Sequence, residues 1–231
     1  MALKLMGKKR GMTQLFDESG QIVVCTIIEV EPNVITQLKT KEADGYTAIQ
    51  LGFEKVTAKD PRRAEARTNG PQRGHFKKNN IHARKYLIES RIDNTEEYTL
   101  GQEISVSAFA GILYVDVIGT SKGKGFQGSI KKSNMKGGPA AHGSGFHRHM
   151  GSTGMRSTPG RCFPNGPRPS QMGSERVTMQ NLRVVQTIEE DNLLLIEGSV
   201  PGANGDLVFI QEAVKRPKQQ TKSSGVKLWQ Q

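Results

Sequence analysis

The 55 residues Thr120–Ser174 constrain the fold of this chain more than any other feature, because they contain almost no side chain that could form a hydrophobic core. Ile130 is the only leucine, isoleucine or valine in this segment, which also holds twelve of the 26 glycines. Such a stretch buries too little apolar surface to offset the conformational entropy lost on ordering. We therefore predict that residues 120–176 form a long irregular arm, carried by a domain that the flanking sequence forms.

Charge also separates Thr120–Ser174 from the rest of the chain. It has no aspartate or glutamate, and we call it the acid-free segment. Its nine cations are Lys122, Lys124, Lys131, Lys132, Lys136, Arg148, Arg156, Arg161 and Arg168. The whole chain has 33 Lys+Arg, 22 Asp+Glu and a formal charge of +11, so the remaining residues are nearly neutral, with 24 basic and 22 acidic side chains. A solvated surface normally mixes both signs, whereas a single sign indicates a polyanionic partner.

Aromatic rings stand between these cations, which distinguishes the acid-free segment from a flexible glycine–serine spacer. They are Phe126, Phe146 and Phe163, together with His142, His147 and His149. Lysine and arginine neutralise phosphates, glycine lets two backbones approach closely, and phenylalanine and histidine offer faces on which unpaired bases stack. The pattern therefore predicts that the arm binds RNA.

The sequence on both sides of the arm predicts β-structure. Short runs rich in β-branched residues are bounded by Gly, Asn, Asp or Pro, and turn signals join several of them. The runs are Ile22–Val30, Val34–Leu38, Gln102–Phe109, Ile112–Ile118, Val177–Thr187, Asn192–Glu197 and Asp206–Ile210, with turns at Glu189–Asn192 and Gly202–Gly205. Many short strands with little helical periodicity favour a mainly β fold, a small barrel or a sandwich.

The remaining segments differ in composition. Residues 57–96 are charged and punctuated by Pro and Gly, with modest periodicity over Ala83–Ile92, and we interpret them as an α+β insertion with one or two short helices. The polar residues 215–231 form a C-terminal tail that contains Trp229. The division that follows assigns residues 1–56, 97–119 and 177–214 to three parts of the β-rich barrel or sandwich.

A nucleotide-dependent enzyme is one alternative to RNA binding. Gly123-Lys-Gly-Phe-Gln-Gly128 matches the glycine pattern of a dinucleotide-binding loop and follows the apolar run Ile112–Ile118. The residues after it have no apolar stripe for a packed helix, and no acid that could bind a ribose occurs before Glu175. No serine–histidine–aspartate set or pair of carboxylates stands out either. We therefore expect no catalytic residues and no cofactor.

A metal site is a second alternative. The three histidines could ligate zinc, although structural zinc sites in short loops usually use closely spaced cysteines, and only Cys162 is near. Cys25 and Cys162 are far apart in sequence and match no metal-ligand spacing. We expect no metal and two reduced thiols.

An anionic membrane is the other polyanion that a basic chain can bind. No apolar run approaches the roughly 20 residues that span a bilayer, and residues 1–16 lack the uninterrupted apolar region of a signal peptide. We therefore expect no membrane partner, no small-molecule substrate, and action in the compartment where the chain is made.

An ordered series of motifs runs through the arm and its flanks. In the arm they are Thr120-Ser-Lys-Gly-Lys-Gly-Phe-Gln-Gly, Lys136-Gly-Gly-Pro-Ala, His142-Gly-Ser, Phe146-His-Arg, Gly151-Ser-Thr-Gly, Thr158-Pro-Gly-Arg and Met172-Gly-Ser-Glu-Arg-Val-Thr. In the flanks they are Gly7-Lys-Lys-Arg-Gly-Met-Thr-Gln-Leu-Phe and Leu193-Leu-Leu-Ile-Glu-Gly-Ser-Val-Pro-Gly-Ala. Over Leu3–Val214 the chain resembles large-subunit ribosomal protein three, in its bacterial and organellar form.

This resemblance implies a closed β-barrel of the type shared with translation factors, an α+β insertion and a long basic loop within ribosomal RNA. It implies a non-enzymatic constituent of the large ribosomal subunit, in a bacterial cytoplasm or an organelle. Such a protein binds large-subunit RNA early, helps nucleate assembly, contacts neighbouring large-subunit proteins and extends its loop toward the peptidyl-transferase centre. The expected RNA-binding residues are then the nine cations, Phe126, the three histidines, Lys8, Lys9, Arg10 and Arg176.

Two positions depart from the family pattern. Bacterial relatives often carry a methylated glutamine near the loop tip, where this chain has Ser157, so we do not expect that modification. Where relatives have a compact basic run, Phe163–Arg168 contains a single cation, which predicts a weaker or differently shaped RNA contact there. A free-standing RNA-binding or RNA-chaperone protein remains the alternative function, since it would need the same basic arm.

Overall fold

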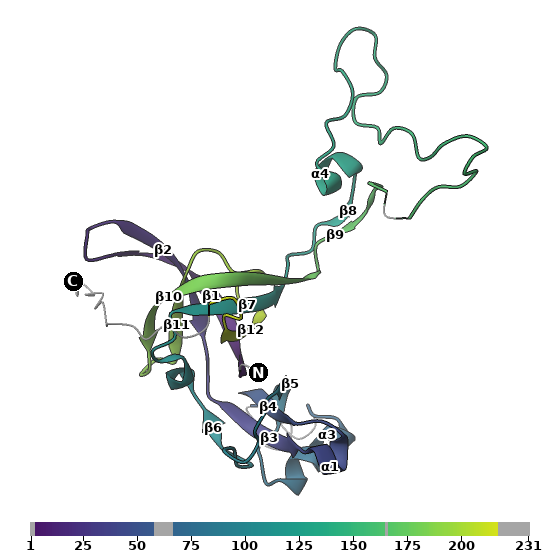
Figure 1. Cartoon of the computed structure of the whole chain (residues 1–231). Helices are drawn as coiled ribbons and strands as arrows, with labels where there is room; N and C mark the ends of the chain where they lie inside the picture. The colour runs from purple at the N-terminus through teal and green to yellow at the C-terminus, as the bar shows by residue number, and fades with distance from the viewer. Residues whose placement is uncertain (1–2, 58–66, 165, 217–231) are drawn as a thin grey trace. The chain divides into compact units, whose positions relative to one another are not determined.

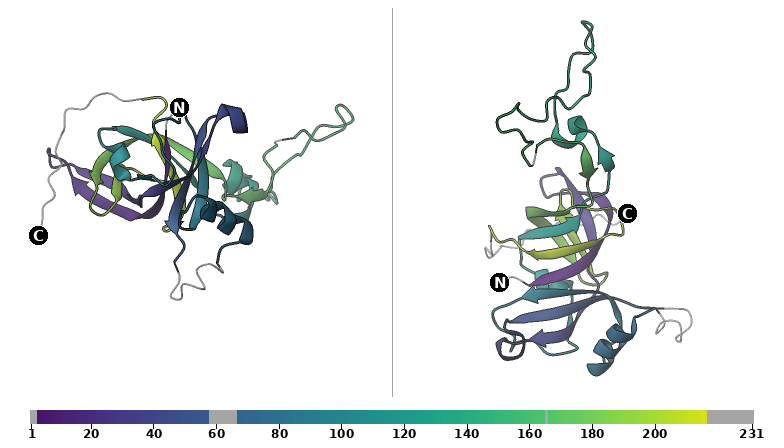
Figure 2. Two further views of the ribbon diagram at one scale, coloured as in Figure 1. Left: turned by 90° about the horizontal axis from the view of Figure 1, so that it is seen from below. Right: turned by 90° about the vertical axis from the view of Figure 1, so that its right-hand side faces the viewer.

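The computed structural model describes residues 3–57, 67–164 and 166–216, which form two units (Figure 1). Unit 1 contains the described residues up to Gly119 and from Val177 onward, and unit 2 is the arm, Thr120–Arg176. Trp229, like residues 217–231 of the predicted tail, lies outside the described residues. Strands make up most of unit 1 in all views (Figures 1 and 2), so the prediction of a mainly β fold is confirmed.

Six antiparallel strands form the first sheet of unit 1. They are β1 (Lys4–Phe16), β2 (Ile22–Glu29), β7 (Tyr114–Thr120), β10 (Arg176–Ile188), β11 (Leu193–Glu197) and β12 (Leu207–Glu212). Their order is β1-β12-β7-β10-β11-β2, and β2 also pairs with β1, with Phe16 opposite Ile22 and Met12 opposite Thr26. The pairings therefore form a cycle that brings together strands from both ends of the sequence.

The second sheet of unit 1 has four strands in the order β5-β4-β3-β6. They are β3 (Asn33–Lys39), β4 (Ala48–Lys55), β5 (Arg84–Arg91) and the short β6 (Glu103–Ile104). The described residues of the unit also form two helices, α1 (Lys41–Asp44) and α3 (Gly70–Lys78), and the 3-10 helix η1 (Val106–Phe109). One core joins the two sheets, since Leu5 and Val117 of the first are fully buried in the same cluster as Ile35, Leu51 and Phe53 of the second.

Strand positions agree with the sequence prediction where β-branched residues dominate. The predicted runs that correspond to β2, β3, β7, β10, β11 and β12 are confirmed to within two residues, as are the turns at Glu189–Asn192 and Gly202–Gly205. By contrast, β1 was not predicted, because two glycines and three consecutive cations interrupt its apolar pattern. It forms because β2 and β12 pair with its two edges.

The predicted insertion contains the short helix α3 and, within Ala83–Ile92, strand β5, which pairs with β4 along its length. Two local predictions are wrong. Residues 33–55 belong to the second sheet rather than to the first part of the barrel, because alternating burial identifies a strand but not its partner. In Gln102–Phe109 only Glu103–Ile104 is a strand, and the 3-10 turn that follows places Val106 and Phe109 three residues apart, both buried.

Beyond Glu29, β2 no longer pairs with β1. The side chain of Asn33 makes hydrogen bonds to β1 there, in place of a neighbouring strand. This fully buried side chain accepts a hydrogen bond from Met6 N–H (3.1 Å) and donates to the carbonyls of Met6 and Glu31 (both 3.0 Å). Without this amide, backbone groups of β1 would be buried without partners, at a cost of about 1–3 kcal/mol each.

We expect Asn33→Ala to lower the free energy of unfolding by about 2–4 kcal/mol, which equilibrium urea denaturation would measure. Asn94→Ala is the matched control, because Asn94 is exposed and should change stability by less than about 0.5 kcal/mol. Equal stability of the two variants would contradict the role assigned to Asn33.

Candidate nucleic-acid interface

A short β-ribbon closes the base of the arm. Strand β8 (Gly125–Gln127) pairs with β9 (Ser170–Met172), and Lys124 N–H donates to the Met172 carbonyl at 2.9 Å. Outside the ribbon, Ser121 N–H donates to the carbonyl of Glu175 (2.9 Å), and Ser174 N–H donates to the carbonyl of Ser121 (3.1 Å). These bonds hold the two ends of the arm together.

Helix α4 (Ser129–Ser133) follows the ribbon, and the described residues beyond it have no helix and no strand until β9 (Figure 1). Here Lys132 donates from its ammonium group to the hydroxyl of Ser170, which ties α4 to β9. The rest of the arm is irregular, as its composition predicts, because it has no leucine, isoleucine or valine to bury.

The positive charge of the arm is exposed. Eight of the nine cations of the acid-free segment are exposed, and Lys132 is half-buried. Within the described part of the arm, none of these cations lies within ion-pair distance of a carboxylate. Their charge is therefore available to an external polyanion.

Aromatic faces lie among these cations. Phe126 is 74% exposed, and Phe163 is 52% exposed with the Arg161 guanidinium 5.6 Å from its ring centre. The Phe146 ring lies 5.8 Å from that of His149, whose N–H donates to the Phe146 carbonyl at 2.8 Å. Large exposed rings beside cations suit stacking on unpaired bases.

The other predicted residues of the arm are also accessible. His142, Arg148, Arg156 and Arg176 are exposed, as is the His147 side chain, while the His147 carbonyl accepts the N–H of Gly138 at 2.8 Å. Phe146, His147 and His149 thus lie in one loop of the structure. The sequence prediction named these three residues only as histidines and aromatics.

One of the three N-terminal cations, Lys9, is a correction to the predicted interface, because it is buried. Lys9 is 8% exposed, and its ammonium group donates to the carbonyls of Val200 (2.7 Å) and Gly202 (3.2 Å). It links β1 to the loop before β12 instead of facing outward, because alternation along a strand turns one of two adjacent residues inward. Lys8 pairs with Glu54 at 2.9 Å and Arg10 with Glu29 at 2.6 Å, so both charges are already balanced within unit 1.

The alternative sites lack the geometry that they need. In the matched glycine motif, β8 has three residues and α4 only five, which is too short for the packed helix of a dinucleotide fold. Among the described residues, no group of three His, Cys, Asp or Glu side chains could hold a metal ion. Cys25 and Cys162 are free thiols, and burial raises the pKa of the Cys25 thiol, which Glu197 raises further.

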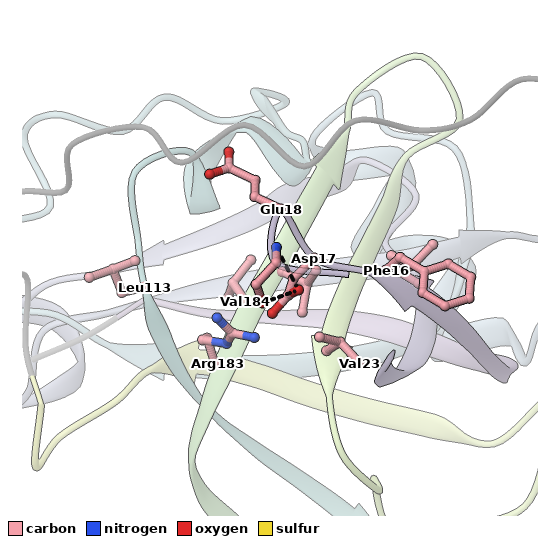
Figure 3. A pocket seen from close by; sticks show the side chains of 10 residues that line it. Phe16, Asp17, Glu18, Val23, Leu113, Arg183 and Val184 are labelled. Carbon is pink, nitrogen blue, oxygen red and sulfur yellow. Dashed lines mark hydrogen bonds between the residues drawn. The ribbon is translucent and has the colours of Figure 1, made fainter. Parts of the chain in front are cut away.

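A pocket of about 280 Å³ lies in unit 1 beside the β1–β2 turn (Figure 3). Asp17 in its wall accepts hydrogen bonds from the Ser19 hydroxyl and from the N–H groups of Gln21 and Ser19, which lower its pKa. Arg183, also in the wall, donates to Glu197 at 2.6 Å. Both charged groups therefore have partners within unit 1, and the described lining residues include no histidine or cysteine.

Gly173 is a residue of the arm whose role composition did not reveal. It has a positive φ of 75°, and a Cβ there would collide with the carbonyl oxygen of Lys122. Only the pairing of the two ends of the arm makes this glycine necessary, and no local motif signals that pairing. Gly125 also has a positive φ (68°) but has open space around it.

We expect Gly173→Ala to open the ribbon and Gly125→Ala to retain it, since both variants carry the strain of a positive φ but only the first adds a collision. Amide hydrogen exchange at Lys124 should be at least about tenfold faster in Gly173→Ala than in Gly125→Ala, which corresponds to about 1.4 kcal/mol. Similar exchange rates in the two variants would show that the ribbon does not depend on Gly173.

A mainly β unit that carries an exposed, acid-free cationic arm with stacking faces has the features expected of a protein that binds RNA through the phosphate backbone and unpaired bases. Within the described residues, no helix is both long and apolar enough to cross a membrane. The family model "Ribosomal protein L3" matches residues 80–192.

Curated relatives match nearly the whole chain. "Large ribosomal subunit protein uL3" of Protochlamydia amoebophila is 61% identical over 221 residues, covering 96% of this chain and 94% of the relative. The proteins of the same name in Chlamydia pneumoniae and Chlamydia muridarum are each 47% identical, covering 91% of this chain and 97% and 96% of the relatives. The chain belongs to the uL3 family of large ribosomal subunit proteins.

Proposed function

We propose that this chain is a structural constituent of the large ribosomal subunit that binds ribosomal RNA through its arm. The observation that carries the proposal is the row of exposed cations without acidic partners in the described arm. Family membership identifies the RNA, because the relatives are named as proteins of the large ribosomal subunit. The protein is not an enzyme, and its place is in the ribosome of a bacterial cytoplasm.

The arm extends from the globular part toward the peptidyl-transferase centre and supports the RNA there without taking part in the reaction. Its cations allow RNA strands to approach one another, so the protein also helps nucleate subunit assembly. The arm has three arginines, Arg156, Arg161 and Arg168, whose planar guanidinium groups bind phosphate in a bidentate manner or stack on bases. Such contacts position the RNA and take no part in the reaction. Neighbouring large-subunit proteins contact unit 1.

The first sheet of unit 1 is a small closed barrel of the translation-protein type. The cyclic order of its strands supports this, since β1 pairs with β12 over Lys4–Lys8 and with β2 over Lys8–Phe16. A closed sheet has no free edge that could pair with another chain. It gives the arm a rigid base at the ends of β7 and β10.

Binding to purified ribosomal RNA tests the proposal against a free-standing RNA chaperone. We expect the purified chain to bind large-subunit RNA at least about tenfold more tightly than small-subunit RNA at the same salt concentration, because phosphate contacts alone carry no sequence information. Equal affinity for the two RNAs, together with faster annealing of unrelated strands, would favour the chaperone function instead.

A further inference from the structure

A basic groove lies in unit 1, apart from the arm in sequence. Helix α3 packs beside the ends of β4 and β5, where Val56 N–H donates to the Ala83 carbonyl at 3.0 Å (Figure 1). The groove between them has a volume of about 1050 Å³. Its described walls are the end of β4 with Val56 and Thr57, α3 with Thr68, and the turn from Asn80 to Ala83.

Among the described residues that line this groove, every charged side chain is positive. Lys55, Arg73 and Lys77 line it and are exposed, and no aspartate or glutamate occurs among its described lining residues. Within the described chain, none of the three has a carboxylate at ion-pair distance. The nearest acid in sequence, Glu54, binds Lys8 at 2.9 Å and Lys85 at 3.4 Å, so its charge is directed to other cations.

Helix α3 contains features that cost stability within the chain. Arg73 and Lys77 are four residues apart, a spacing at which like charges repel on a helix. Gly70 and Gly74 show the same spacing, and a Cβ at either position would meet nothing within 4 Å. A glycine inside a helix, such as Gly74, costs about 1 kcal/mol relative to alanine, and no close contact with a described residue requires a glycine there. Both features become favourable if an anionic backbone approaches this face closely.

The lining favours a sugar–phosphate backbone over a protein partner. Its large apolar side chains are withdrawn from solvent, since Phe76 is 2% exposed and Val56 and Ile81 are half-buried. An amphipathic helix would therefore find little apolar surface to cover. A phosphate backbone needs only cations and open polypeptide backbone, and this groove offers both.

We propose that the groove formed by α3 and the ends of β4 and β5 binds the backbone of a second RNA segment, independently of the arm. This inference rests on the proposed function for the identity of the RNA as large-subunit RNA. It assigns RNA binding to residues of this region, none of which belongs to the interface predicted from the sequence. Lys55, Arg73 and Lys77 contact phosphates, and Gly70 and Gly74 allow the strand to approach the helix backbone.

The test compares three triple variants of the full chain in binding to large-subunit RNA. The groove variant is Lys55→Gln, Arg73→Gln and Lys77→Gln. The control is Lys4→Gln, Lys41→Gln and Arg91→Gln, which removes the same charge from unit 1 outside the groove. The third, Lys122→Gln, Lys124→Gln and Lys136→Gln, removes the same charge from the arm. Glutamine is a good helix former, so α3 should persist, and circular dichroism checks this.

We expect the groove variant to bind at least about tenfold more weakly at 150 mM salt and the control to change by less than about threefold. The slope of log K against log salt should become less negative by about 2–3 for the groove variant, as expected for three lost phosphate contacts. If the groove variant matches the control in affinity and slope, the groove does not bind RNA. If the arm variant also matches the control, the proposed function itself fails.

Discussion

Replacing Ser121–Gly173 by a short glycine–serine turn is expected to leave a cooperatively folded unit 1 that has lost most of its affinity for ribosomal RNA. The buried hydrophobic side chains of the described chain all lie outside the arm. The two ends of the arm are already joined by the bonds between Ser121, Ser174 and Glu175, so a short turn can close the gap. A shorter closing loop also lowers the entropy cost of folding, by about 0.6 kcal/mol for each halving of its length.

Thermal unfolding and RNA binding measure the two halves of this prediction. The midpoint of the thermal transition should be unchanged or higher, whereas affinity at 150 mM salt should fall by roughly a thousandfold or more. A full-length control with all nine cations of the acid-free segment changed to glutamine separates loss of charge from loss of chain. Loss of the cooperative transition on arm replacement would mean that the arm belongs to the core of the protein.

The second large effect concerns salt. Because the nine cations have no internal acidic partners in the described arm, each can displace a counterion from RNA. We expect log K against log salt to be steeper for the wild-type chain than for the nine-glutamine variant, by a slope difference on the order of −5 to −8. Filter binding between 50 and 300 mM salt, a range of about sixfold, would measure it. A difference near −1 would show that few of these side chains meet phosphate.

Composition was sufficient to predict the arm, because the arm is irregular for want of leucine, isoleucine and valine side chains. The change in composition after Gly119 and before Val177 falls at the boundary between unit 1 and unit 2. A segment with a single leucine, isoleucine or valine cannot form a core of its own, so its irregularity can be predicted without knowledge of tertiary contacts. Strands such as β2 and β10, rich in β-branched residues, were predictable for a similar reason, since their local preference agrees with their final pairing.

Long-range pairing accounts for what the local sequence could not predict. Strand β5 has no clear alternation and becomes a strand through β4, with Ala48 opposite Arg91 and Lys55 opposite Arg84. The assignment of β3 and β4 to the second sheet depends on the same contacts. These pairings join residues about 30–45 positions apart, so a reading of local periodicity could not find them.

The candidate site shows the same contrast. The composition of the arm was enough to predict that its cations are exposed. The burial of Lys9 could not be predicted in this way, because its ammonium group binds the carbonyls of Val200 and Gly202, which lie far along the sequence. The basic groove was missed because Lys55 lies 18 and 22 positions before Arg73 and Lys77 in the sequence, and only the fold brings the three to one groove. The spacing of Arg73 and Lys77 on a predicted helix was the one local signal available.

Sedimentation of the tagged full-length chain from a lysate of its own cells tests the central claim most directly. On a sucrose gradient, the chain should migrate with the large subunit and with whole ribosomes, in a constant ratio to large-subunit RNA. It should remain there after a wash at moderate salt, because phosphate contacts from many cations are lost only at high ionic strength. A chain that stays at the top of the gradient, or that follows other RNAs in variable amounts, would contradict its assignment as a constituent of the large subunit.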